Sequence, residues 1–273
     1  MTLQDAALRL YASRLASRSF LTETEERAIL GLTGSMKEVK GHADVVSYGD
    51  AVTHCCLVVE GCVGRFGQSR DGTRQITSLY IPGDLAGLPS VMSPSSGWGL
   101  VALKGATVLQ IAHDSIRSIA ARNPGVAEAL WRDCIADESI SSKWLVNVGH
   151  KEALPRLAHF LCEMAVRYER IGRGDKKSFL LPITQVDIGE ANGLTSVHVN
   201  RMIRDLRLQS VATIHAAIVT IHDWGKLASI GEFDPTYMLL DGPAPRLFHP
   251  VDTQLNAKFG RHLPLQSQQF CNC

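Results

Sequence analysis

The sequence predicts an α+β protein with a β-rich first half, a long central helix and a helix-turn-helix in its second half. Three observations lead to this fold class. Short Val- and Ile-rich runs alternate with turn signals over residues 39–112. Asn123 and Pro124 then open a helical stretch, and residues 181–208 show the pattern of two short helices joined at Gly193.

Length and composition are typical of a two-domain protein of the reducing cytoplasm. The chain has 273 residues and a net charge of +1, so no global basic signal for nucleic acid exists. Residues 151–226 hold 11 Lys and Arg against 8 Asp and Glu, a local balance of +3. The seven cysteines are scattered and indicate no disulfide framework. We find no apolar run long enough for a membrane span, and the first 15 residues lack the apolar core of a signal peptide.

The first half begins with helical sequence over residues 2–31, where Thr22 is placed to cap a second helix. Strands follow. We expect two strands on either side of Gly61 and two more around Lys104-Gly105. Asp71-Gly72 predicts a tight hairpin, and Pro82-Gly83-Asp84 predicts another turn. Strands this short with turns this regular favour a β-barrel or jelly roll.

The central helix is predicted to begin with Asn123 as N-cap and Pro124 as its first residue, and to end near Asn147, before Gly149. About 24 residues at 1.5 Å each make it about 36 Å long. Its apolar side could pack against a second copy of the chain or only against its own domain. The residues on that side are Val126, Leu130, Trp131, Cys134, Ile135, Trp144, Leu145 and Val148.

The two short helices of the second half carry clear start and stop signals. Thr184 is a good N-cap, followed by Gln185 and Asp187 in the first turn. Gly193 stands where a helix C-terminus needs a left-handed residue, and Thr195 caps the second helix. A further amphipathic helix over residues 152–170 precedes this pair.

The second of the two helices is amphipathic and presents a basic face. A face of this kind fits a DNA major groove, where Arg reads guanine through two hydrogen bonds. The alternative is an ordinary helical hairpin whose basic face is only solvated. The predicted buried stripe is Val199, Met202, Ile203 and Leu206. The outward face holds Val197, Arg201 and Arg204, flanked by Ser196, His198, Asn200 and Asp205.

Specific residues within this stretch resemble the helix-turn-helix of the Crp/Fnr (cyclic AMP receptor protein/fumarate-nitrate regulator) family of bacterial transcription regulators. They are Ile183-Thr184-Gln185, Asp187-Ile188-Gly189, Gly193-Leu194-Thr195, Val199-Asn200-Arg201 and Leu206. The first half resembles the same family at the hairpin over residues 71–76 and at residues 80–88.

The resemblance implies three regions. These are a cyclic-nucleotide-binding-like β-roll as sensor domain (1–122), a dimerisation helix (123–149) and a winged helix-turn-helix domain (150–240). It implies a homodimer on a palindromic double-stranded DNA operator, with RNA polymerase as a further partner if the protein is an activator. Residues 241–273 hold four prolines and several glutamines without periodicity, a composition that predicts a disordered tail.

Departures from the family pattern bear on the effector. Cyclic-nucleotide binders of the family hold the phosphate with an Arg-Ser/Thr-Ala cluster, but residues 85–103 contain no Lys or Arg here. A buried cyclic phosphate without a cation would be costly, so we expect no binding of cyclic AMP in the usual way. Neighbouring Cys55 and Cys56 point to opposite faces of a strand, which is typical of structural thiols. We predict no cofactor and no metal, and His54 as a haem ligand is disfavoured.

The wing and the tail depart from the family pattern or carry only weak sequence signals. Ser210 stands where the family usually has glycine, and the two predicted wing strands are joined around His215-Ala216-Ala217 without a turn pair such as Asn-Gly. We therefore expect a short or distorted wing. Cys271 and Cys273 in the tail are a weak signal for a soft metal.

Seven residues form the predicted DNA-binding site: Thr195, Ser196, Val197, His198, Asn200, Arg201 and Arg204. Thr195, Ser196 and nearby backbone N–H groups would contact phosphate, and Arg201 is the candidate for reading guanine. The alternative is a winged-helix protein-interaction module that has lost specific DNA binding. An enzyme is not indicated, because the sequence has no phosphate loop, metal-spaced histidines or nucleophile elbow.

Overall fold

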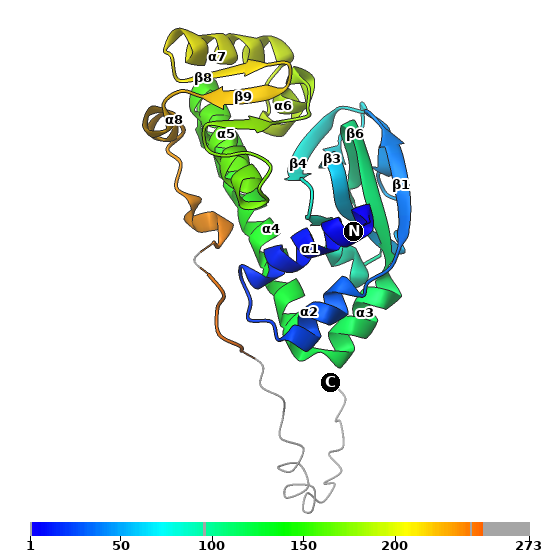
Figure 1. Cartoon of the computed structure of the whole chain (residues 1–273). Coiled ribbons are helices and arrows are strands. Elements are labelled where there is room, and N and C mark those ends of the chain that lie inside the picture. Colours follow the sequence, from blue (N-terminus) through cyan, green and yellow to red (C-terminus); the bar gives the residue numbers. More distant parts are fainter. Residues whose placement is uncertain (1, 95–96, 241, 248–273) are drawn as a thin grey trace, which may run out of the picture.

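Two long antiparallel strands, β3 (His54–Gln68) and β6 (Gly99–Ala112), form the centre of the N-terminal half (Figure 1). The structure is a computed structural model, which describes residues 2–94, 97–240 and 242–247. β1 (Ser35–Lys40) and β2 (Asp44–Val46) pair with β6, whereas β4 (Arg74–Tyr80) and β5 (Leu85–Ala86) pair with β3. All these pairings are antiparallel, and together they make up the predicted β-roll.

The prediction of separate strands around Gly61 and around Gly105 was wrong. Each glycine lies inside one continuous strand, β3 or β6. Both have positive φ, +81° at Gly61 and +128° at Gly105, and the β3–β6 register shifts next to Gly61. These glycines therefore make a bulge, which bends a strand without ending it. The Asp71-Gly72 hairpin is confirmed, with Gly72 at φ +84° between β3 and β4.

Two capped helices precede the β-roll. α1 (Leu3–Ala16) and α2 (Glu23–Leu30) each begin with a capping box, on Thr2 and on Thr22. The predicted cap by Thr22 is thus confirmed. A short 3₁₀ helix, η1 (Leu88–Val91), follows β5, and α3 (His113–Arg122), which the sequence did not predict as a separate helix, follows β6.

The central helix α4 (Pro124–His150) is longer than predicted. Its 27 residues span about 40 Å at 1.5 Å per residue, and Gly149 lies inside it. Asn123 stands at the N-cap position of α4 with Pro124 directly after it, as predicted. Its side chain makes no capping hydrogen bond, however, and donates instead to the backbone oxygen of Ile119 in α3 (2.8 Å). α3 and α4 thus follow each other directly.

The C-terminal half starts with α5 (Ala153–Arg170) and continues with β7 (Ser178–Leu180), α6 (Gln185–Asn192) and α7 (Ser196–Leu208). β8 (Ala212–His215), β9 (Ile218–Ile221), α8 (Trp224–Gly231) and the 3₁₀ helix η2 (Pro235–Met238) complete it. The small sheet has the order β7-β9-β8. α6, α7 and the sheet lie at one end of the molecule, far from α2 and α3 (Figure 1).

The two halves share one hydrophobic core and several polar contacts. Phe66 and Leu79 of the β-roll belong to the same buried cluster as Leu161 of α5. Trp144 of α4 donates its indole N–H to Glu163 of α5 (2.9 Å). The side chain of Gln75 in β4 also donates to the backbone oxygen of Glu190 in α6, and the β-roll therefore contacts the helix-turn-helix directly.

Residues 242–247 pack against the body of the protein, which corrects the expectation that they belong to a disordered tail. Ala244 forms a β-bridge with Ser19, and Arg132 of α4 donates to the backbone oxygens of Ala244 and Pro245. Arg246 forms an ion pair with Glu25. The rest of the predicted tail (248–273), with Cys271 and Cys273, lies outside the described residues.

Among the residues that the structure describes, no helix has the length and apolar character needed to cross a membrane.

Candidate nucleic-acid interface

The turn between α6 and α7 is built by local sequence signals. Thr184 and Asp187 form a capping box at the start of α6. Gly193 ends α6 in the left-handed conformation (φ +61°), as the sequence predicts. A Cβ on Gly189 would collide with the backbone oxygen of Leu194, so the close approach of α6 to the turn requires glycine there. These constraints fix the angle at which α7 leaves α6.

Helix α7 packs on this frame through one side. Thr195 caps it, and its hydroxyl oxygen accepts from the His198 backbone N–H (3.3 Å). Val199, Met202 and Leu206 are buried, and Ile203 is partly buried against the same core, which confirms the predicted stripe. The opposite side of α7 is therefore turned away from the protein.

The other predicted site residues come together on that outward side. Val197 is 75% exposed, and Arg201 and Arg204 are also exposed. Neither arginine takes part in a salt bridge within the described part of the chain. Ser196, His198 and Asn200 lie exposed beside them. A cationic surface without internal partners is available to an anionic partner.

Three of the predicted site residues, Thr195, His198 and Asn200, already have internal hydrogen bonds. Asn200 donates from its side-chain nitrogen to the side-chain oxygen of Gln185 (3.2 Å), which joins α7 to the first turn of α6. The hydroxyl of Thr195 lies 3.2 Å from Nδ1 of His198 and also caps α7. Thr195 and Asn200 thus help to hold the two helices in position.

The geometry adds candidates that the sequence analysis did not select. Gln185 and Val186 are exposed in the first turn of α6, and Arg207 is exposed in the last turn of α7. In helix-turn-helix proteins the first helix crosses the DNA backbone while the second enters the groove. Gln185 could therefore have been selected from the sequence, because it lies in the first helix of the predicted motif. Arg207 could be selected only after the structure showed which side of α7 is exposed.

The wing is regular, which corrects the expectation of a short or distorted one. β8 and β9 are joined by a two-residue turn, Ala216-Ala217, with φ of +49° and +66°. Both values are left-handed, as in the type I′ turn that suits the twist of a hairpin. Ser210 also adopts a left-handed conformation (φ +54°) where the family usually has glycine. The wing therefore has a regular backbone although Ser210, Ala216 and Ala217 disfavour the left-handed conformation that they adopt.

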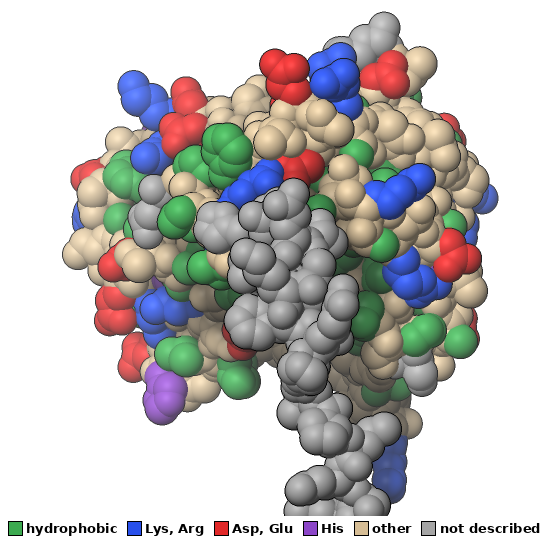
Figure 2. All heavy atoms as spheres, turned by 90° about the horizontal axis from the view of Figure 1, so that it is seen from below, with side chains coloured by type: hydrophobic (Ala, Val, Ile, Leu, Met, Phe, Trp, Pro, Cys, Tyr) green, Lys and Arg blue, Asp and Glu red, His purple; other side chains and the backbone are tan. Residues whose placement is uncertain are grey.

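Lys176, in the loop before β7, is less available than the arginines of α7. The Lys176 ammonium lies 3.7 Å from Glu169 and over the ring of Trp224, so this lysine is engaged within its own domain. Figure 2 shows the end of the molecule opposite α7. On the described part of that face, acidic and basic side chains are interspersed.

The β-roll segment that would hold a cyclic phosphate is filled by its own side chains. A Cβ on Gly87 would lie 3.2 Å from the indole ring of Trp98. The buried Ser90 hydroxyl donates to the Gly87 backbone oxygen (2.6 Å) and lies 2.9 Å from Nε2 of His113. No arginine or lysine occurs in residues 85–103. The residues present do not fit a cyclic nucleotide phosphate.

The cysteines of the β-roll do not fit an iron–sulfur cluster. Cys55 and Cys56 belong to different buried clusters on the two sides of β3, as expected from neighbouring strand positions. Burial raises the pKa of Cys55, Cys56 and Cys62 to about 12, which disfavours the thiolate that binds a metal. No set of three metal-binding side chains comes together in the described residues.

Comparison with known proteins finds a matching domain family for each half of the chain. Residues 36–123 match the cyclic nucleotide-binding domain family, and residues 155–230 match the Crp-like helix-turn-helix domain family. The two matches follow each other in the order that the resemblance implied. The chain belongs to the Crp/Fnr family of transcription regulators.

Similar proteins agree with this assignment. The anaerobic regulatory protein of Haemophilus influenzae is 24% identical over 228 residues, which cover 84% of this chain and 88% of that protein. Its namesake in Aggregatibacter actinomycetemcomitans is 25% identical, over 67% of this chain and 70% of that protein. The solved structure of FixK2 from Bradyrhizobium japonicum has a TM-score of 0.66 and 25% identity, and covers 73% of this chain and 98% of that one. Relatives of this Crp/Fnr chain are thus regulators and not enzymes.

Proposed function

We propose that this Crp/Fnr protein is a homodimeric transcription regulator that reads a palindromic double-stranded DNA operator with α7. The observation that carries the proposal is the outward face of α7, where Arg201 and Arg204 are exposed without salt bridges in the described chain. DNA supplies the negative charge and the hydrogen-bond acceptors that such a face lacks.

Residues along α7 are assigned to two kinds of contact. Thr195, Ser196 and the free backbone N–H groups at the start of α7 contact phosphate, because a helix N-terminus attracts anions. Arg201 reads guanine in the major groove. Ser196, Val197 and Asn200 reach other base edges, and Val197 suits a thymine methyl group. Arg204 on the same outward face and His198 at its flank add contacts to the DNA backbone.

The dimer is supported by an exposed apolar stripe on α4. Trp131, Ile135 and Leu145 are 62%, 50% and 74% exposed. At 100° per residue these three side chains fall within one narrow sector of the helix. An exposed stripe of large apolar side chains along a long helix is typical of a helix–helix interface. Two copies joined here would place two α7 helices on half-sites about one DNA turn apart.

The effector of the β-roll is proposed to be something other than cyclic AMP, because Trp98 and the uncharged 85–103 segment leave no cation for its phosphate. We place the regulator in the bacterial cytoplasm, where its operator is. If the bound dimer activates transcription, RNA polymerase is its second partner.

The test is selection of bound sequences from a random duplex pool at two salt concentrations. We expect an enriched inverted repeat whose affinity falls steeply as salt rises, since each neutralised phosphate releases counterions. Arg201→Ala should lose the enrichment at one position of each half-site. Arg9→Ala, an exposed change on α1 far from α7, is the matched control and should select the same repeat. No enrichment with the wild-type protein would favour the protein-interaction module instead.

A further inference from the structure

Two side-chain amides, Gln185 of α6 and Asn200 of α7, form a hydrogen bond at the surface of the helix-turn-helix. Asn200 donates from Nδ2 to Oε1 of Gln185 (3.2 Å). Both side chains are exposed. Gln185 is the first residue of α6, and Asn200 lies in the second turn of α7. The bond therefore joins the start of the first helix to the outward side of the second.

This bond adds little to the stability of the fold, because water replaces an exposed hydrogen bond between neutral groups at small cost. The angle between α6 and α7 is already set by the turn, where Gly193 has φ +61° and Gly189 leaves no room for a Cβ. The buried Ile188 and Val199 hold the two helices on the core. The main consequence of the bond is the direction in which the Asn200 amide points.

One edge of the Asn200 amide stays unused. A side-chain amide has two N–H groups and a carbonyl oxygen that accepts. Gln185 takes one N–H of Asn200, and Oδ1 of Asn200 accepts from no residue in the described part of the chain. The second N–H and Oδ1 therefore remain available side by side, as one donor and one acceptor.

Gln185 also keeps a free donor. Among the described residues, none accepts a hydrogen bond from its Nε2. In helix-turn-helix proteins the first helix crosses the DNA backbone, and Gln185 stands at the start of that helix. Asp187, the acidic residue of this turn, is buried and accepts from Thr184 in the capping box. Nε2 of Gln185 is thus available to a phosphate oxygen.

We propose that Asn200 reads an adenine in the major groove and that Gln185 is the positioning residue that holds the Asn200 amide for this base. The inference rests on the proposed DNA reading by α7. Adenine offers N7 as an acceptor and its N6 amino group as a donor, which match the free N–H and Oδ1 of Asn200. Guanine offers two acceptors, cytosine a donor and thymine an acceptor. Adenine alone uses both free groups of the Asn200 amide.

Gln185 decides which way round the Asn200 amide stands. An exposed asparagine amide without an acceptor beside it can turn and exchange the positions of its nitrogen and oxygen. With Oε1 of Gln185 beside Nδ2, such a turn brings two carbonyl oxygens together, which is unfavourable. A phosphate bound to Nε2 fixes Oε1 in its turn. Phosphate, Gln185, Asn200 and adenine thus form one chain of hydrogen bonds.

Asn200 and Arg201 read neighbouring base pairs. At about 100° per residue, they point roughly 60° and 40° to either side of Val197 on the outward face of α7. The Cα atoms of consecutive residues are about 3.8 Å apart, close to the rise of about 3.4 Å between base pairs. We therefore expect the adenine one or two base pairs from the guanine that Arg201 reads.

The test uses the full-length protein, selection from a random duplex pool, and fluorescence anisotropy on operators that differ at single base pairs. The base pair read by Asn200 is the one whose enrichment is lost in Asn200→Ala. We expect adenine there, bound at least about tenfold more tightly than any other base. In Asn200→Ala the four operators that differ at this base pair should bind within about twofold of one another.

Two substitutions at the exposed Gln185 separate positioning from phosphate contact. Gln185→Lys keeps a donor for phosphate but removes the acceptor for Asn200, so the adenine preference should fall at least about threefold while the mean affinity for the four operators is kept. Gln185→Glu keeps the acceptor but repels phosphate, so binding should weaken on all four operators and the adenine preference should stay. Gln209→Lys, an exposed change at the C-cap of α7, is the matched control and should keep the adenine preference.

A bond that only holds the helices predicts another result. Both Gln185 variants would then weaken binding by the same factor on every operator, and this outcome would overturn the positioning role. An inverted repeat in which Asn200→Ala changes no position, or changes one that is not adenine, would overturn the assignment and leave α7 as a DNA reader. Absence of any enriched repeat with the wild-type protein would refute DNA reading itself, and the inference with it.

Discussion

Arg167 of α5 donates to the carboxylate of Asp84, in the turn after β4, at 2.7 Å, and both side chains are buried. The two residues lie 83 positions apart in the sequence and on different halves of the chain. Arg167 also donates to the backbone oxygen of Leu79 (2.6 Å). This relationship fixes the helix that leads to the helix-turn-helix against the β-roll.

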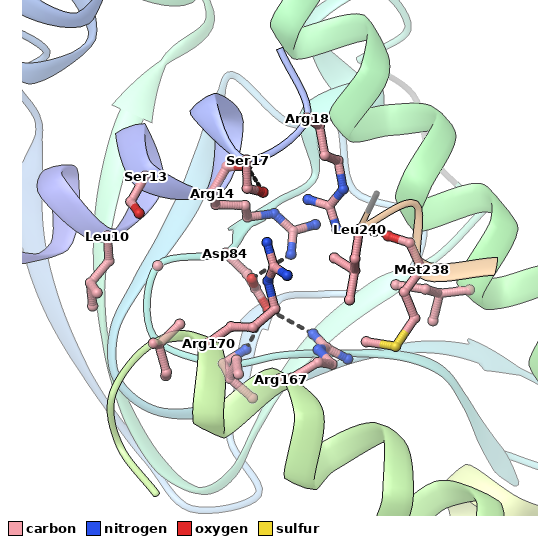
Figure 3. A pocket seen from close by; sticks show the side chains of 14 residues that line it. Leu10, Ser13, Arg14, Ser17, Arg18, Asp84, Arg167, Arg170, Met238 and Leu240 are labelled. Carbon is pink, nitrogen blue, oxygen red and sulfur yellow. Dashed lines mark hydrogen bonds and ion pairs between the residues drawn. The ribbon is translucent and has the colours of Figure 1, made fainter. Parts of the chain in front are cut away.

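The first prediction concerns this pair. Asp84→Asn should lower the free energy of unfolding by about 1–3 kcal/mol, because a neutral amide replaces the carboxylate that Arg14 and Arg167 share (Figure 3). The loss stays below that of a fully broken buried ion pair, since Arg14 keeps Asp133 and Asp137 and Arg167 keeps Glu163. Urea unfolding followed by circular dichroism measures the change. The matched control is Asp44→Asn, which removes an ion pair with Arg74 that is about one quarter exposed. Its cost should be about 1 kcal/mol or less, and similar losses in both variants would contradict this account.

The second prediction concerns base reading by α7. Arg201→Ala should weaken operator binding by about 1–3 kcal/mol and relax specificity at one base pair of each half-site. Binding to a set of operator variants by fluorescence anisotropy measures both effects.

Arg204→Ala provides the contrast, since Arg204 is exposed on the same face of α7. We expect a uniform loss on every sequence and a shallower salt dependence, as for a phosphate contact. A uniform loss from Arg201→Ala as well would remove Arg201 from the base-reading role.

Sequence reasoning succeeded where structure is decided locally. The caps Thr22, Thr184 and Thr195, and the left-handed Gly193, act within a few residues of their own position. Such signals are visible in a single sequence. The resemblance to a known family then supplied the order of the domains.

The errors have two physical causes. Gly61 and Gly105 were interpreted as turns, whereas a glycine with positive φ also bends a continuous strand when both sides stay paired. The turn at Ala216-Ala217 has no favourable residues, so tertiary pairing of β8 with β9 imposes it. The cluster around Asp84 could not be predicted, because its members are 70 to 83 positions apart in the chain.

The third prediction concerns the proposed dimer. Leu145→Glu should raise the dimer dissociation constant at least about tenfold, because a carboxylate would lose its hydration in an apolar interface. Leu145 is 74% exposed in one copy, so the fold of that copy should be unaffected. Analytical ultracentrifugation measures the change, and operator affinity should fall in parallel. Leu3→Glu, at an exposed leucine on α1, is the matched control. A dimer that survives Leu145→Glu would place the interface elsewhere.

The fourth prediction concerns the wing. Ala217 has φ +66°, a region that costs a residue with a Cβ about 1–2 kcal/mol and costs glycine little. Ala217→Gly should therefore raise the free energy of unfolding of the DNA-binding half by about 0.5–1 kcal/mol. This net gain is smaller than the strain that glycine relieves, because glycine also increases the conformational entropy of the unfolded chain. Ala212→Gly, in the regular strand β8, lacks the left-handed backbone and should destabilise instead. Hydrogen exchange of the β8 and β9 amides separates the two cases. If amide protection from exchange falls in both variants, the left-handed backbone at Ala217 carries no strain that glycine can relieve.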